Sequence, residues 1–468
     1  MTKFLFAFVL PLLFVFSSHA DPKYRILEHQ EFARAKFMAA RGEADTLGGL
    51  PVVVKDGIFS QKLDHFSAPD ARVFNQRYFY SSTRAKAKNS PVLIFICGEG
   101  VCSSGALQGI IQAHAYTIGA HLFALEHRYY GKTQPFPDLS TENLKYLSTE
   151  QALEDLVQFK RAMQKQMGLT GPWIAVGGSY AGNLAAYLRS QYPLDFAAAL
   201  ASSAPVLPDR DFSEYDRHVA RMAGVTCTKA INTVVADIEA QIKTDVGFQA
   251  ARSLFMADTV SRRDDFLYLL ADIASAAIQY GMRDDFCNTV EAQGQAGYVT
   301  MKKKVDQLFG NFADYSAEAA ENIAVANHSG ALGMRQWFYQ SCTEYGYWQN
   351  ADAKESMRSK QINASYHDEL CRRLFNFQKA GPVDSILRKL YEPLLNPALT
   401  SRILYTSGSV DPWNNLSIIN ENGNNVNPNT EAFLMQGAAH CDDLGRGQAA
   451  DVKVAIQRFR DLLPTWIK

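Results

Sequence analysis

One serine lies at a junction between two kinds of sequence, in residues 171–187, GPWIAVGGSYAGNLAAY. An apolar run ends at Gly177 and Gly178, Ser179 follows, and helix-forming residues continue from Tyr180. Small residues are needed where a strand turns sharply into a helix, and a serine on such a turn presents its hydroxyl as a nucleophile. Glycines at a strand–helix junction can also serve close packing alone, so the motif by itself leaves both interpretations open.

A serine hydroxyl needs a nearby base, and the base needs a carboxylate that orients it. Asp411 follows the apolar run RILYTSG, and His440 follows the run EAFLMQG. Asp-Pro is also a common turn opener, and a single loop histidine is often an ordinary surface residue. The order Ser, Asp, His, with the last two after late strands, is that of α/β-hydrolases. Together the three residues predict a hydrolase with the catalytic triad Ser179, Asp411 and His440.

Acyl transfer also requires two backbone N–H groups that face the developing oxyanion. The N–H of Tyr180, directly after the serine, is one candidate, and the loop after the strand LIFIC offers Gly98, Glu99 and Gly100. We take Gly98 as the second oxyanion donor, although an ordinary glycine-rich turn would give the same sequence.

His127, in LEHRYYGKTQP, is a rival base because it also follows an apolar run. It precedes the serine, which is the wrong order for this architecture. We therefore predict that Glu126, His127 and Arg128 form a buried polar network below the site. Aromatic residues nearby are expected to form its walls: Tyr129, Tyr130 and Trp413.

Apolar, β-branched runs alternate with helical patterns over the first two hundred residues, which predicts a mostly parallel sheet covered on both faces. A helix is predicted over Thr149–Met167, opened by a capping box of Ser148 and Gln151. A second helix is predicted at the end of the chain, over Gln448–Leu462. The predicted strands are Val73–Tyr80, Val92–Cys97, Leu122–Leu125, Ile174–Val176, Phe196–Ala201, Arg402–Ser407 and Glu431–Met435.

Helical periodicity dominates between about Pro208 and Asn396, and β-rich runs nearly vanish there. This predicts an α-helical cap inserted into an α/β unit, above the carboxyl ends of the strands where such sheets bind ligands. The expected division of the chain is a signal peptide, the first part of an α/β-hydrolase domain, the cap, and the second part of that domain: residues 1–20, 21–207, 208–396 and 397–468.

Composition and the first residues limit the class of protein. The chain has 468 residues, 47% of them hydrophobic, and a net charge of −1, so nothing favours nucleic acid as a partner. Lys3, an apolar stretch and Ser18-His19-Ala20 are typical of a secretory signal peptide. That apolar stretch is shorter than the roughly 20 residues that span a bilayer, and no later segment is long enough. We expect export and no membrane span.

Seven cysteines in an exported chain predict a few disulfides and at least one unpaired thiol. Their spacing does not reveal which cysteines pair. The sequence has no Cys-x-x-Cys pair and no His-Glu-x-x-His helix, so no metal or other cofactor is expected.

Several spaced motifs resemble one family of serine peptidases, that of lysosomal Pro-Xaa carboxypeptidase, dipeptidyl peptidase II and thymus-specific serine protease. The resemblance covers nearly all of the chain after residue 57, and RQWFYQSCTEYGYWQ (335–349) is most similar to the thymus-specific branch. The motifs that carry it are QKLDHF (61–66), FNQRYFY (74–80), EHRYYG (126–131), GGSYAG (177–182), DPW (411–413) and GAAHC (437–441).

This resemblance implies an α/β-hydrolase fold with a helical cap, peptide substrates, and cleavage after proline from one end of the chain. It implies the same triad, with Tyr180 and the Gly98 loop as oxyanion donors and Trp413 against the proline ring. Two residues depart from the family pattern: Ala181 replaces a glycine, and Asn183 stands near the specificity pocket where many relatives have an apolar residue.

The sequence leaves several alternatives open. Carboxypeptidase action and dipeptidyl peptidase action are both open, because the residues that recognise a charged chain end would lie in the poorly matched cap. A broader serine carboxypeptidase, an esterase and a catalytically silent binding protein on the same fold are alternative functions. An extracellular, periplasmic or lysosome-like location and a homodimer are also open, as are glycans at three Asn-x-Ser sites, Asn327, Asn363 and Asn415.

Overall fold

The computed structural model describes residues 52–327, 332–351, 355–377, 387–419, 427–445 and 447–468. The predicted signal peptide, residues 1–20, lies outside this part of the chain. Within the described residues, no helix has both the length and the apolar character needed to cross a bilayer.

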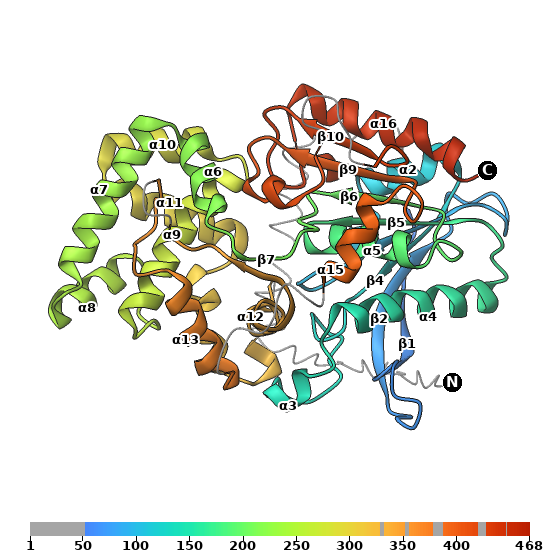
Figure 1. The fold of residues 1–468 in the computed structure, drawn as a ribbon, viewed down its shortest axis with the longest axis horizontal. Coiled ribbons are helices and arrows are strands. Elements are labelled where there is room, and N and C mark those ends of the chain that lie inside the picture. The colour runs from blue at the N-terminus through green and yellow to red at the C-terminus, as the bar shows by residue number, and fades with distance from the viewer. Residues whose placement is uncertain (1–51, 328–331, 352–354, 378–386, 420–426, 446) are drawn as a thin grey trace, which may run out of the picture.

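The molecule is built around one eight-stranded sheet with the order β1-β2-β4-β3-β5-β6-β9-β10 (Figure 1). The pairs β1–β2 and β2–β4 are antiparallel, and all other pairs are parallel. The predicted, mostly parallel sheet is therefore confirmed. Its strands are β1 (Lys55–Lys62), β2 (Val73–Ser81), β3 (Val92–Ile96), β4 (His121–Leu125), β5 (Trp173–Gly178), β6 (Ala198–Ser202), β9 (Ile403–Gly408) and β10 (Glu431–Met435).

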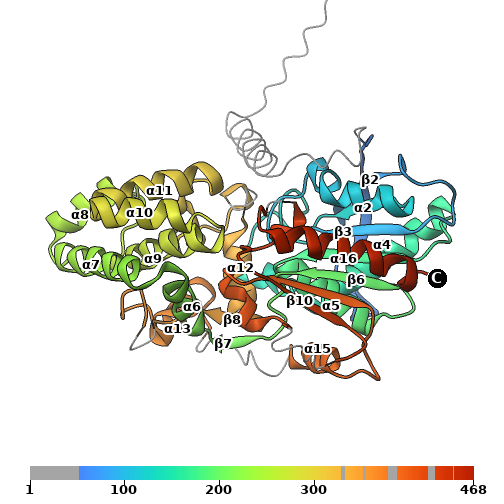
Figure 2. The ribbon, with the colours of Figure 1, turned by 90° about the horizontal axis from the view of Figure 1, so that it is seen from above.

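Helices cover both faces of this sheet, as Figure 2 shows. Helices α2 (Ile110–Ile118) and α16 (Ala450–Trp466) pack on one face. Helices α4 (Thr149–Met167) and α5 (Tyr180–Gln191) pack on the other. The central strands are buried on both sides, which explains their continuous apolar sequences. This arrangement confirms the α/β-hydrolase fold.

Helix α4 begins where the capping box predicts. The side chain of Ser148 accepts a hydrogen bond from the N–H of Gln151 at 3.3 Å. The reciprocal half of the motif is absent, because the Gln151 carboxamide instead binds Asp64 (2.7 Å) and the N–H of His65 (3.0 Å). Gln151 thus ties the helix start to the segment after β1.

A helical region lies beside the sheet in Figure 1, between β6 and β9 in the sequence. It also contains a two-stranded sheet of β7 (Asp209–Asp211) and β8 (Gly346–Trp348), which the sequence did not predict. Its helices are α6 (Glu214–Ala223), α7 (Val225–Gln241), α8 (Asp245–Leu254), α9 (Arg263–Gln279), α10 (Arg283–Gln293), α11 (Gln295–Phe309), α12 (Met334–Gln340) and α13 (Ala364–Phe375). We call this region the cap, and its boundaries at residues 208 and 396 stay predictions.

Shorter elements complete the described chain. Two short helices are α3 (Thr141–Leu144) and α15 (Arg388–Tyr391), and a π-helical turn, Ser341–Tyr345, joins α12 to β8. Sequence analysis missed strand β1, whose residues are largely exposed and lack an apolar run. It pairs with β2 and lies at the edge of the described sheet.

Candidate active site

Ser179 occupies the sharp turn between β5 and α5. Its backbone φ is 57°, in the left-handed region that residues with a side chain rarely adopt. A Cβ atom on Gly177 would lie 2.0 Å from the carbonyl oxygen of Ala181, so only glycine fits there. A Cβ on Gly182 would lie 2.9 Å from both the Ser202 carbonyl and the Ala204 side chain. These glycines therefore permit the turn that presents Ser179, and Ala181 is compatible with it.

His440 and Asp411 form a buried pair at the ends of β10 and β9. The Nδ1 of His440 lies 2.8 Å from Oδ2 of Asp411. Because a carboxylate can only accept, the imidazole donates this bond, which leaves Nε2 free to act as a base. The second oxygen of Asp411, Oδ1, accepts the backbone N–H of Trp413 at 3.0 Å. Both carboxylate oxygens are thus held.

The loops that carry these two residues are joined by backbone contacts. The N–H of Val410 donates to the carbonyl of Ala438 at 3.0 Å. A Cβ on Gly408 would lie 2.2 Å from that same carbonyl oxygen, so glycine is required where the loops cross. The spacing of His440 and Asp411 follows from the parallel pairing of β9 and β10.

The serine turn and the histidine loop are both anchored at the end of β6. The N–H of Ser179 donates to the Ser202 carbonyl at 2.8 Å, and the N–H of Cys441 donates to Oγ of Ser203 at 2.9 Å. A Cβ on Gly178 would lie 3.0 Å from Sγ of Cys441. The immediate neighbours of Ser179 and His440 are therefore in contact, at the same edge of the sheet as Asp411.

A buried carboxylate that sequence analysis missed supports this edge. Oδ1 of Asp443 accepts the Ser202 hydroxyl at 2.5 Å, and Oδ2 accepts the Thr406 hydroxyl at 2.7 Å. Burial raises the pKa of Asp443, although the two hydroxyls oppose that shift. Asp443 thus links β6, β9 and the histidine loop, and nothing in the sequence distinguishes it from a solvent-exposed loop aspartate.

The negative charge of Asp411 raises the pKa of His440. Burial alone would lower the pKa of the imidazole, but the Asp411 carboxylate, together with the adjacent Cys441 side chain, holds that pKa well above its usual range. This is the expected effect of a carboxylate hydrogen-bonded to the charged form of a base. The pair therefore stabilises an imidazolium, the species a general base becomes after it takes a proton.

The Gly98 loop lies against the first turn of α5. A Cβ on Gly98 would lie 3.5 Å from the Ala181 Cβ and 3.9 Å from Cδ1 of Tyr180. The tyrosine hydroxyl bonds Nε2 of His127 and Nε2 of Gln340, each at 2.9 Å. Tyr180 is thus fixed from both the sheet and the cap.

His127 belongs to the predicted polar network. Its Nδ1 lies 2.7 Å from the carbonyl oxygen of Arg128, and burial lowers its pKa to about 4. Arg128 is fully buried and binds both oxygens of Asp155, while the Glu126 carboxylate pairs with Arg77. Both ring nitrogens of His127 are hydrogen-bonded to groups other than the serine, so His127 has a structural role.

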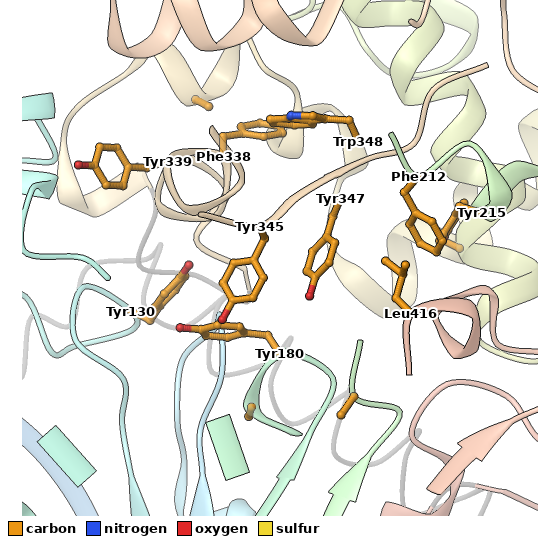
Figure 3. Packing of buried hydrophobic residues seen from close by; sticks show 14 of the residues in the cluster. Tyr130, Tyr180, Phe212, Tyr215, Phe338, Tyr339, Tyr345, Tyr347, Trp348 and Leu416 are labelled. Carbon is orange, nitrogen blue, oxygen red and sulfur yellow. The ribbon is translucent and has the colours of Figure 1, made fainter. Parts of the chain in front are cut away.

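Aromatic side chains gather between the sheet and the cap, and Figure 3 shows Tyr345 and Tyr347 pointing from the cap toward the end of the sheet. Around Trp413, the ring centroids of Phe212, Tyr215 and Tyr347 lie 5.3, 5.5 and 5.2 Å away. The indole N–H of Trp413 donates to Oε1 of Gln279 at 3.0 Å. Trp413 therefore stands in a wall of aromatic rings and its one polar group is already satisfied.

Asn183 is fully buried on α5, one turn after Ser179. Its amide nitrogen donates to the Tyr347 hydroxyl at 3.2 Å, and that hydroxyl donates to the Pro205 carbonyl. The side-chain oxygen of Asn183 has no hydrogen-bond partner among the residues that the structure describes. Asn183 thus contacts Tyr347, a member of the aromatic wall around Trp413.

All seven cysteines lie in the described chain. Three disulfides form, Cys97–Cys102, Cys227–Cys287 and Cys342–Cys371, and Cys441 is free and buried. The prediction of a few disulfides with one unpaired thiol is confirmed. Among the described residues, one group has the spacing of metal ligands: Cys227, Cys287 and Glu291. Its two sulfurs are bonded to each other, and metals bind the thiolate form of cysteine.

Comparison with known proteins agrees with this geometry. Residues 61–462 match the family described as serine carboxypeptidase S28. This chain belongs to the S28 family. It is a serine-type peptidase, and the resemblance drawn from its motifs is confirmed.

Proteins similar to this chain come from plants and animals. "Probable serine protease EDA2" of Arabidopsis thaliana is 38% identical over 77% of this chain and 75% of its own length. The thymus-specific serine protease of Mus musculus is 28% identical, over 90% of this chain and 89% of its own. The lysosomal Pro-X carboxypeptidase of the same species is 26% identical, over 84% of each chain.

Proposed function

We propose that this S28 peptidase is an exported exopeptidase that cleaves short peptides after proline through a Ser179–His440–Asp411 triad. The observation that carries the proposal is the bond between His440 Nδ1 and Asp411 Oδ2, beside the strained turn of Ser179. Nε2 of His440 takes the proton of the Ser179 hydroxyl as the oxygen attacks the peptide carbonyl. Asp411 holds the imidazole in the required tautomer and stabilises its charged form.

The reaction then proceeds through an acyl-enzyme. The tetrahedral oxyanion receives hydrogen bonds from the backbone N–H groups of Tyr180 and Gly98. His440 gives its proton to the leaving nitrogen, which departs and leaves the peptide acyl group on Ser179. A water molecule, deprotonated by His440, hydrolyses this ester and regenerates the serine.

The wall around Trp413 supports a preference for proline. A flat indole ring suits the pyrrolidine ring, and the polar groups of the wall are turned toward Gln279 and Pro205 rather than toward a substrate. The name of the Pro-X carboxypeptidase relative agrees with this preference. That name and the three disulfides also support export to an extracellular or lysosome-like compartment.

One observation favours a second candidate, a serine carboxypeptidase of broader specificity. Asn183 brings an unpaired amide oxygen beside Tyr347 in the pocket wall. A substrate side chain with a hydrogen-bond donor would satisfy that oxygen if the wall opened, whereas proline would not. The chemistry at Ser179 would be the same.

Fluorophosphonate labelling combined with a peptide digest tests the proposal. The protein should be labelled at Ser179, and the label should be lost in His440→Ala. A library of short peptides, read by mass spectrometry, should show cleavage after proline at one end of the chain. Labelling without cleavage after proline would support the broader specificity, and absence of labelling would overturn the triad.

A further inference from the structure

Gln279 connects the cap to the catalytic loop. It is the last residue of α9, and its backbone carbonyl accepts the N–H of His440 at 3.0 Å. The residue is 8% exposed, and its side chain lies against Trp413 and Tyr215. No sequence motif singled out this residue, because a glutamine at the end of an amphipathic helix is ordinarily a solvent-facing group.

The orientation of its carboxamide is fixed by chemistry. Trp413 Nε1 lies 3.0 Å from Oε1 of Gln279, and the hydroxyl of Tyr215 lies 2.6 Å from the same atom. An indole N–H can only donate, so the atom that faces it must be the amide oxygen. The NH2 group consequently points away from both aromatic residues.

That NH2 group has no acceptor among the residues that the structure describes. Its nitrogen, Nε2, is not among the buried side-chain atoms that lack a hydrogen-bond partner, so it is not fully closed to solvent. A donor of fixed direction is therefore open to a ligand, next to the wall of the proposed proline pocket and one hydrogen bond from the backbone of His440.

The chemistry of a proline peptide matches such a donor. Proline lacks a backbone N–H, so the peptide unit that joins the preceding residue to proline can only accept hydrogen bonds. A protein group that binds this peptide unit must therefore donate a hydrogen bond to its carbonyl oxygen. The unpaired atom of Asn183 is an oxygen, which cannot donate, and its NH2 group already donates to Tyr347.

We infer that Nε2 of Gln279 donates a hydrogen bond to the substrate carbonyl directly before the proline and so positions the peptide for attack by Ser179. This inference rests on the proposed function. Trp413 contacts the proline ring, and Gln279 binds the adjacent carbonyl. The hydrogen bond from Trp413 to Gln279 fixes the two side chains relative to each other. Gln279 is thus a positioning residue for peptides with an internal Xaa-Pro bond.

A comparison of four proteins on two substrates tests the inference: the unaltered protein, two Gln279 variants and one control. Gln279→Glu keeps the oxygen that accepts from Trp413 and Tyr215 but replaces the NH2 group, and Gln279→Met removes the donor without adding charge. The substrates are the free tripeptide Xaa-Pro-Phe, whose Pro–Phe bond a carboxypeptidase and a dipeptidyl peptidase would both cleave, and its thioxo analogue. In the analogue, sulfur, a weaker acceptor, replaces the carbonyl oxygen before proline. Gln241→Glu, the same change on α7, is the matched control.

For the unaltered protein we expect the thioxo substrate to show about tenfold lower kcat/KM, the value of one good hydrogen bond. In both Gln279 variants this tenfold preference for the oxo substrate over the thioxo substrate should disappear, whereas Gln241→Glu should keep it. Equal losses on both substrates would overturn the inference.

Fluorophosphonate labelling separates this result from the proposed function, because the probe reports on Ser179 without filling the subsite before proline. Unchanged labelling with the selective loss supports Gln279 as a positioning residue. If the unaltered protein is labelled but hydrolyses neither proline substrate, the proline preference fails and this inference falls with it. If Ser179 is not labelled at all, the triad itself is wrong.

Discussion

The imidazole of His440 donates to the carboxylate of Asp411 across 2.8 Å, although 28 residues separate the two in the sequence. The second carboxylate oxygen accepts the N–H of Trp413, so the carboxylate that binds the imidazole also binds the backbone of Trp413 in the aromatic wall. One aspartate therefore fixes both the tautomer of His440 and the backbone position of Trp413.

Replacing Asp411 by Asn should remove activity and leave the fold intact. The amide oxygen can still accept from Trp413, but the NH2 group would face Nδ1 and favour the wrong tautomer of His440. We expect kcat to fall about 10⁴-fold, with little change in the thermal unfolding temperature. Asp461→Asn, on the exposed side of α16, is the control, and an Asp411→Asn enzyme with near-normal kcat would contradict the assigned role.

Ser179→Ala should be folded and inactive. Alanine keeps a side chain of similar size in the strained turn, so stability should change little. Loss of a triad nucleophile is expected to lower kcat by about 10⁶-fold. Steady-state hydrolysis of a peptide substrate measures the loss of kcat, and circular dichroism checks that the protein is folded. Residual turnover above one per cent would rule out Ser179 as the nucleophile.

Glu344 should make the protein more stable in mild acid than at neutral pH. This buried carboxylate accepts the N–H and hydroxyl of Thr149 at the start of α4, and burial raises its pKa to about 7. Because the folded pKa exceeds the unfolded one, the native state binds more protons between about pH 4.5 and 7. Stability from this group is therefore lost as pH rises through that window, by at most about 3 kcal/mol.

The measurement is the free energy of unfolding of Glu344→Gln and of the unaltered protein at pH 5 and pH 7.5. Glutamine keeps an acceptor for Thr149 but does not titrate, so the difference between the two proteins should shrink or reverse in favour of the variant at the higher pH. Identical pH dependence in both proteins would show that Glu344 ionises without cost.

Asn183→Leu should stabilise the protein. The unpaired amide oxygen is buried, which costs on the order of 1–3 kcal/mol, and the Tyr347 hydroxyl keeps its bond to Pro205 without the asparagine. We expect the free energy of unfolding in urea to rise by about 1 kcal/mol. Asn183→Asp, which buries a charge instead, should be destabilised. A less stable leucine variant would mean that the oxygen has an unseen partner.

Much of this protein follows from its sequence. The glycines around Ser179 predicted the sharp turn, since no larger residue than glycine fits at Gly177, and the late Asp411 and His440 fell in loops after parallel strands. The capping box at Ser148 placed the start of α4. These features depend on local geometry, periodicity and chain order, which a sequence displays directly.

Other features were decided only by tertiary structure. Strand β1 lacks an apolar run and is stabilised by its pairing with β2. Strands β7 and β8 pair although more than 130 residues separate them in the sequence. Asp443, Glu344 and Gln279 resemble surface residues in the sequence, yet each becomes buried beside partners from distant elements. The motifs predicted the candidate chemistry of the site because the reaction limits which residue types can carry it. The buried polar residues around the site depended on long-range contacts, because many residue types can satisfy a buried hydrogen bond.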